Sequence, residues 1–129
     1  MTPKDPVKDT VALVRCESYE REALDTAIAS AAELIGFTEL AEYVGKKVLV
    51  KINLLNGARP ETSSTTHVEF TRSVIRYLKS HGIEPVVSDS SGPLEDTWGC
   101  FRRSGYAAMC EEEGVSIEPL SRAGYERIE

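Results

Sequence analysis

The chain has 129 residues, of which 41% are hydrophobic and 28% charged, and its formal net charge is −6. These values are typical of a globular protein rather than a disordered or membrane-embedded one, and the negative charge argues against a nucleic-acid-binding surface. No apolar run reaches the ~18 residues of a membrane span, and the N-terminus lacks the apolar core of a signal peptide. We expect a cytoplasmic protein with a flexible lead-in at 1–10 and a single domain at 11–129.

The first expected element is a buried strand at Val11–Cys16, because this stretch is largely apolar and rich in β-branched residues. A helix follows, with Ser18 as its N-cap and Gly36 as the residue that ends it. Its apolar stripe has helical spacing and consists of Leu24, Ile28, Ala31, Leu34 and Ile35. The sequence of residues 37–47 predicts a short helical connection to the next strand.

The next strand covers residues 48–53 and ends in two hydrogen-bonding side chains on one face. Side chains alternate along a strand, so Lys51 and Asn53 lie on the face opposite Val48, Val50 and Ile52. Ligands bind at the carboxyl ends of parallel strands, which makes Lys51 and Asn53 candidates for holding an anionic group. The alternative is that the strand lies at the sheet edge and Lys51 points into water.

A long loop, residues 54–66, leads into a helix that Gly82 ends. Thr66 and Glu69 have the spacing of a capping box. The apolar face of this helix is Phe70, Val74, Ile75 and Leu78. A capping role accounts for Thr66, but not for the five consecutive hydroxyl residues at 62–66 followed by His67. Because helix N-termini bind anions, we expect this segment to contact a ligand. His67 could act as an acid or base near neutral pH. The alternative is that it is simply an exposed first residue of the helix.

A third strand at 84–89 ends in Asp89, which is followed by Ser90 and Gly92 in a turn. This loop could wrap an anion with its amides, or Asp89 could bind a metal or a sugar hydroxyl. The alternative is an Asx turn in which Asp89 satisfies its own loop. The glycines form neither GxGxxG nor a Walker motif, so no dinucleotide or P-loop site is predicted.

The remaining pattern predicts a helix over 97–113, broken near Gly105, and a fourth strand at 115–120. The alternation of strands and helices indicates an α/β fold, in three layers, with a mostly parallel sheet of about four strands and helices on both faces. Right-handed crossovers place the loops after Cys16, Asn53 and Asp89 on one edge of the sheet.

We interpret the cysteines, two arginines and a second histidine as structural residues. The three cysteines, Cys16, Cys100 and Cys110, have no CxxC spacing, and we interpret them as small hydrophobes rather than metal ligands. A four-cysteine cluster cannot form within one chain that has three cysteines. Arg102 and Arg103 belong to a solvated helix face in this interpretation, and His81 complements a helix dipole.

Several segments resemble the N-terminal part of the domain of unknown function 362 family. The matching motifs are Lys51-x-Asn53-Leu54, Thr65-Thr66-His67 and Asp89-Ser90-x-Gly92, although the family's usual Lys-Pro-Asn has Ile52 in place of proline. The resemblance extends from about Val11 to Leu120. It implies an iron–sulfur-associated setting, but the chain lacks a ferredoxin cysteine run and matches only the first half of the usual domain. A cluster is therefore expected only through a partner, either a ferredoxin-like protein or a homo-oligomer.

Our leading hypothesis is a domain that binds a small anionic ligand at the carboxyl ends of its strands. The binding residues are Lys51, Asn53, Thr65, Thr66, His67, Asp89, Ser90 and Gly92. Lys51 would stabilise negative charge and His67 or Asp89 would move a proton. The alternative is a non-catalytic binding or assembly module that a partner chain or a second copy completes. The sequence leaves open whether the protein is an enzyme.

Overall fold

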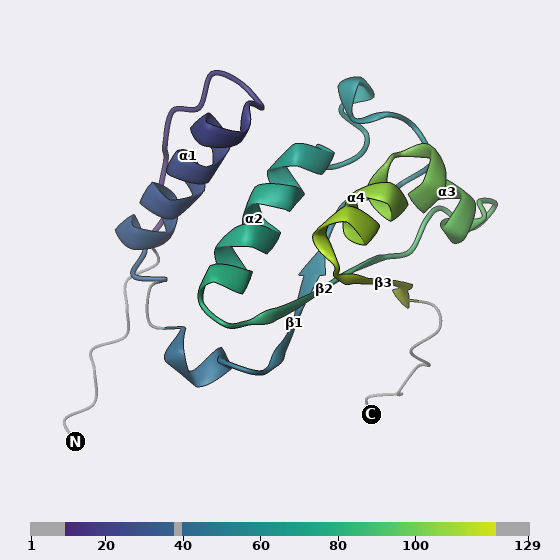
Figure 1. Ribbon diagram of the computed structural model, residues 1–129. Coiled ribbons are helices and arrows are strands. Elements are labelled where there is room, and N and C mark those ends of the chain that lie inside the picture. The colour runs from purple at the N-terminus through teal and green to yellow at the C-terminus, as the bar shows by residue number, and fades with distance from the viewer. Residues whose placement is uncertain (1–9, 38–39, 121–129) are drawn as a thin grey trace, which may run out of the picture.

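The computed structural model describes residues 10–37 and 40–120, so most of the expected lead-in at 1–10 lies outside it. The elements follow one another in the order helix, strand, helix, strand, two helices, strand (Figure 1). The helices are α1 (Arg21–Leu34), α2 (Val68–Ser80), α3 (Thr97–Arg103) and α4 (Tyr106–Glu113), with 3₁₀ turns η1 (Ala41–Tyr43) and η2 (Pro60–Thr62). The strands are β1 (Lys47–Lys51), β2 (Glu84–Asp89) and β3 (Ser116–Pro119).

The three strands form one parallel sheet in the order β1-β2-β3. Val50 pairs with Val87 and Val87 with Ile117, so the centre of the sheet is built from β-branched side chains. The expected α/β class is confirmed. The sheet has three strands in the described part of the chain, one fewer than the sequence pattern suggested.

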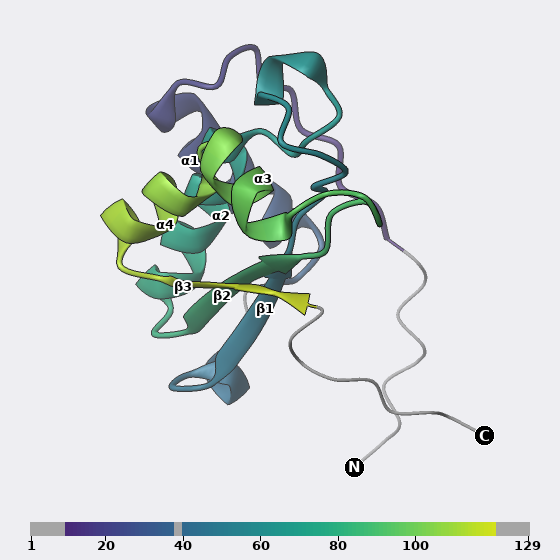
Figure 2. The same cartoon turned by 90° about the vertical axis from the view of Figure 1, so that its right-hand side faces the viewer.

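The four helices lie on one side of the sheet, with α1, α2 and α4 side by side (Figures 1 and 2). Right-handed crossovers between strands in consecutive order place every crossover helix on the same face. The expected helices on both faces would require the strand order to reverse. The opposite face is correspondingly open, and Leu49 on it is 54% exposed.

The main core lies between the sheet and the helices α2, α3 and α4. Its fully buried side chains include Ile75, Val87, Phe101 and Tyr106. A second cluster of Leu40, Leu78 and Ile83 fills the amino-terminal end of the sheet. Phe70, predicted on the apolar face of α2, is 44% exposed instead.

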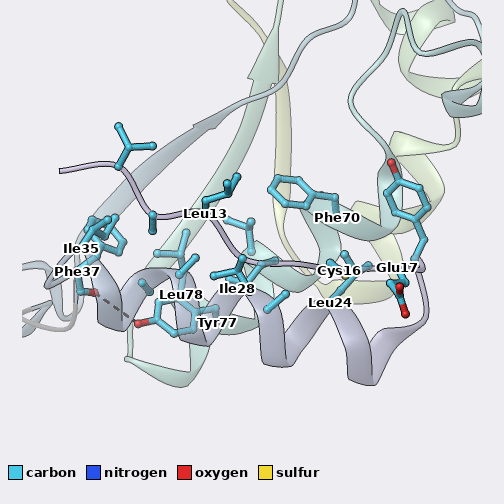
Figure 3. Close-up of a pocket in the computed structure, with 18 of the residues that line it drawn as sticks. Leu13, Cys16, Glu17, Leu24, Ile28, Ile35, Phe37, Phe70, Tyr77 and Leu78 are labelled. Atoms are coloured by element: carbon cyan, nitrogen blue, oxygen red, sulfur yellow. Dashed lines mark hydrogen bonds between the residues drawn. The ribbon is translucent and has the colours of Figure 1, made fainter. Parts of the chain in front are cut away.

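The predicted strand at Val11–Cys16 is wrong, because this segment has no strand structure. It runs alongside α1 (Figure 3) and, with residues of α1 and α2, lines an apolar groove. β-Branched residues favour a strand only where a neighbouring strand supplies hydrogen bonds and a packing surface, and this segment has neither.

The helix ends differ in detail from the predicted caps. His67, and not Thr66, is the N-cap of α2, because its Nδ1 accepts the amide hydrogen of Glu69. Glu20 takes the N-cap position of α1 in place of Ser18. The predicted break near Gly105 is confirmed, since that glycine has a φ of 89° between α3 and α4. A side chain would be strained at such a backbone angle.

Candidate functional site

An ion pair between Lys51 and Asp89 joins the carboxyl ends of β1 and β2. The Lys51 Nζ lies 3.0 Å from Asp89 Oδ1 and also donates to the Ile52 carbonyl at 2.9 Å. The second carboxylate oxygen of Asp89 accepts the Leu54 amide at 2.6 Å. The Asp89 side chain is 7% exposed and that of Lys51 58%. Asp89 therefore anchors both the lysine and the start of the loop after β1.

The long loop folds back onto the end of β1. The Asn53 amide donates to Thr66 Oγ1 at 2.9 Å, and the Thr66 amide donates to the Asn53 carbonyl at 3.0 Å. Leu54 and Thr65 form an antiparallel bridge beside them. The Asn53 side-chain amide donates to the Ser64 carbonyl at 2.8 Å. Thr65 and Thr66 thus shape the loop through contacts within the protein.

Tyr106 of α4 forms a hydrogen bond to this loop, and the sequence analysis did not predict that contact. Its hydroxyl donates to the Thr66 carbonyl and contacts the Thr71 hydroxyl, both at 2.8 Å. Burial raises the pKa of Tyr106 to about 12, so the phenol remains a hydrogen-bond donor at neutral pH. A tyrosine amid apolar helix residues carries no sequence signal for this role.

His67 lies at the start of α2 and stacks on Tyr19. The ring centroids are 3.6 Å apart with 9° between the planes, and His67 is half-buried. Because Nδ1 accepts the Glu69 amide at 3.2 Å, the ring proton of neutral His67 is on Nε2. This pairing could not be predicted from the sequence, because Tyr19 precedes α1 and His67 precedes α2.

The loop after β2 contacts the loop after β1 at Gly92. Its amide donates to the Leu55 carbonyl at 2.8 Å, and an added Cβ would lie 3.3 Å from that oxygen. A side chain at residue 92 would therefore require the Leu55 carbonyl to shift by a few tenths of an ångström. The neighbouring Ser90 is exposed. The proposed Asx turn does not account for Asp89, which bonds to the other loop.

The structure thus brings Lys51, Asn53, Thr65, Thr66 and Asp89 into one bonded network, with Gly92 joined to it through Leu55. His67 follows directly on Thr66, but its side chain contacts Tyr19 and the Glu69 amide. Lys51 belongs to an edge strand, as the alternative interpretation supposed, and it is partly exposed as well as paired.

Arg102, Arg103 and His81 have structural contacts. Arg103 pairs with Glu95 at 3.1 Å and lies against Gly57, while Arg102 pairs with Asp96 at 3.6 Å. His81 is the C-cap of α2, and its Nδ1 lies 2.8 Å from the Tyr77 carbonyl.

The cysteines are separated and differ in exposure. Cys100 and Cys110 are buried and Cys16 is exposed. Burial raises the pKa of both buried thiols, that of Cys110 to about 11. Within the described residues, no three histidine, cysteine or acidic side chains gather in a way that could hold a metal ion. These residues do not fit an iron–sulfur cluster.

We expect one fast-reacting thiol in the native protein and three after denaturation. Cys16 is accessible, whereas Cys100 and Cys110 are buried and protonated at neutral pH, and thiolate is the reactive form. Titration with a chromogenic disulfide reagent, with and without guanidinium, measures this directly. Cys16→Ser should remove the fast phase, and two or more fast thiols in the native protein would contradict the observed burial.

The family model for a domain of unknown function, DUF362, matches residues 48–129 of this chain. This match covers more than half of the chain and includes β1 from its second residue, β2 and the loops that follow them. The chain belongs to the DUF362 family. The resemblance of Lys51-x-Asn53, Thr65-Thr66-His67 and Asp89-Ser90-x-Gly92 to family motifs is consistent with this membership.

One relative of this chain is the thylakoid-associated protein sll1697 of Synechocystis. It is 28% identical over 108 residues, which are 84% of this chain and 33% of the relative. The chain therefore spans about a third of that relative's length. No solved structure matches the chain. Among the described helices of this DUF362 member, none has the length and apolar character needed to cross a membrane.

Proposed function

We propose that this protein binds a small anionic molecule at the carboxyl ends of β1 and β2, with Lys51 as the principal contact. The ammonium of Lys51 supports this proposal most directly. It has three protons, of which two are directed to Asp89 and the Ile52 carbonyl. The side chain is 58% exposed, so a third donor remains for an acceptor in solution.

Further donors at this edge remain available in the same proposal. Asn53 is exposed, and its side-chain amide uses one hydrogen for the Ser64 carbonyl and keeps another. Ser90 presents an exposed hydroxyl next to Asp89. The Nε2–H of His67 is a further donor. Thr65, Thr66 and Gly92 hold the two loops in the shape that these donors require.

Lys51 would stabilise negative charge on the ligand, and His67 or Asp89 would transfer a proton if the site performs chemistry. We favour His67 for the proton, because both oxygens of Asp89 already accept hydrogen bonds from Lys51 and Leu54. Asp89 then acts as a positioning residue that aims the ammonium.

We place this binding in a redox setting in the cytoplasm, with a ferredoxin-like protein or a second copy as partner. The support is the resemblance to a family associated with iron–sulfur proteins. Any cluster would belong to the partner, because the described residues of this chain do not gather its ligands. The matched relative is described as thylakoid-associated.

Calorimetric titration with inorganic phosphate tests the site, using Lys51→Gln and a matched control, Lys47→Gln. Both lysines belong to β1 and face the same way, but Lys47 lies at the amino end, where it pairs with Glu84 at 3.7 Å. Lys51→Gln should weaken phosphate binding at least about tenfold, which is the size of one charge-assisted hydrogen bond. Lys47→Gln should bind normally.

The melting temperature distinguishes a binding role from a structural one. Because Lys51 is mostly exposed, its loss should cost no more than about 1 kcal/mol of unfolding free energy. A large loss of stability in Lys51→Gln with phosphate affinity intact would overturn the assignment.

A further inference from the structure

Val11–Val14, in the segment before α1, have no backbone pairing with any other described residue. The N–H and C=O groups of these residues have no hydrogen-bond partner in the described part of the chain. Their side chains alternate, since Val11 and Leu13 are 89% and 95% exposed whereas Ala12 and Val14 are half-buried. Alternating side chains and unused backbone groups are the properties of a strand that lacks its neighbour.

The same segment borders an apolar groove of about 820 Å³ between α1 and α2. In Figure 3, Leu24 and Ile28 of α1 lie on one side of the segment, and Leu13 and Phe70 lie on the side away from α1. Six residues that line the groove are large, hydrophobic and exposed: Val11, Leu13, Tyr19, Ile35, Phe37 and Phe70. Apolar side chains gathered in this way mark an interaction surface more often than singly scattered ones.

We propose that two copies of this chain associate through antiparallel pairing of their Val11–Val14 segments about a two-fold axis. This inference goes beyond the anion site and does not depend on it. A two-fold contact requires one surface to be complementary to itself. A short antiparallel strand meets this requirement, because each copy donates to and accepts from the other.

The composition of the segment favours this pairing over addition to the sheet edge. Val11–Val14 contains no charged residue, proline or glycine, and valine has a high strand propensity. The exposed edge strand β1 carries Lys47 and Lys51, and charged side chains on an edge oppose strand addition. In a two-fold antiparallel pair the two Arg15 side chains lie at opposite ends and do not repel each other.

The apolar side chains around the groove supply the remaining stabilisation. A two-stranded pair this short is marginal in water on its own. Val11 and Leu13 would pack across the new pair, and the second copy would cover Ile35, Phe37 and Phe70 at the groove. The dimer therefore depends on both the backbone pairing and this patch.

Light scattering after size exclusion, over a range of concentrations, tests the proposal with Leu13→Asp and a matched control, Leu94→Asp. Leu13 is 95% exposed and Leu94 is 100% exposed in the loop after β2, so neither change should disturb the monomer fold. Circular dichroism checks this. We expect a dimer for the wild type and Leu94→Asp, and loss of the dimer in Leu13→Asp.

Hydrogen exchange locates the contact. The amides of Val11–Val14 should be protected in the wild-type dimer and exchange freely in Leu13→Asp. A wild type that stays monomeric at every concentration would overturn the proposal. This holds even if the Val11–Val14 amides are protected from exchange, because they could then be paired with β1 of the same chain. A dimer that persists in Leu13→Asp with these amides unprotected would also overturn it.

Discussion

Replacing Asp89 by alanine should lower the unfolding free energy by about 1–3 kcal/mol, because the buried Leu54 amide loses its acceptor. The ion pair with Lys51 adds less, since the lysine is largely exposed. The same change should weaken phosphate binding, because the ammonium is no longer aimed. Urea unfolding measures the first effect and calorimetry the second.

Asp89→Asn separates the two contributions. Asparagine keeps an oxygen that can accept the Leu54 amide, so most of the stability should return, whereas the charge that holds Lys51 is lost. An Asp89→Ala variant as stable as the wild type would show that the Leu54 amide does not depend on this carboxylate.

Replacing Glu113 by alanine should cost about 1.5–3 kcal/mol of unfolding free energy, because Glu113 joins α4 to α2. Its carboxylate accepts from Arg76 Nη2 at 2.7 Å and from Arg72 Nη1 at 3.0 Å, and its side chain is 12% exposed. Glu111 is an exposed residue of the same helix with no ion pair in the described part of the chain. Glu111→Ala is therefore the control and should be nearly neutral in urea unfolding.

The contribution of Glu113 should disappear in acid. Burial by itself raises the pKa of this carboxyl, but hydrogen bonds from Arg76 and Arg72 outweigh burial and hold the pKa below its ordinary value of 4.5. A lowered pKa stabilises the fold above the unfolded value, and this stabilisation is lost as the pH falls through the folded value. The stability difference between wild type and Glu113→Gln should therefore shrink below about pH 4.5. A difference that is unchanged at pH 3 would contradict this account.

Sequence pattern predicted most of the fold between residues 47 and 119, because each element there has clear periodicity and a clear end. The strand at 84–89 was predicted with the observed bounds. Gly82, Gly105 and Gly114, all with positive φ, mark where helices end or break. Local rules suffice at these places because the cause of each boundary lies within a few residues.

Features that depend on distant partners could not be predicted. The Val11–Cys16 segment has the composition of a strand, but composition does not reveal whether an edge is available to pair with it. Helices on both faces were expected from the alternation of strands and helices. That alternation does not determine the strand order, and the observed order β1-β2-β3 places the crossover helices on one face.

The candidate site divides in the same way. The position of Lys51 and Asp89 at strand ends was evident from the sequence, whereas their ion pair depends on the register between β1 and β2. The support of Thr66 by Tyr106 and the stacking of Tyr19 on His67 join residues 40 or more positions apart. The ligand-binding roles of the eight proposed residues remain predictions.

Native mass spectrometry of protein purified without oxygen tests the central proposal most directly. It reports bound mass, metal content and oligomeric state together. We predict a retained small anion on the wild type and on Lys47→Gln that is absent from Lys51→Gln, with each variant folded. An empty wild-type protein that also fails to take up added phosphate, or a bound anion that Lys51→Gln retains, would contradict an anion site at the carboxyl ends of β1 and β2.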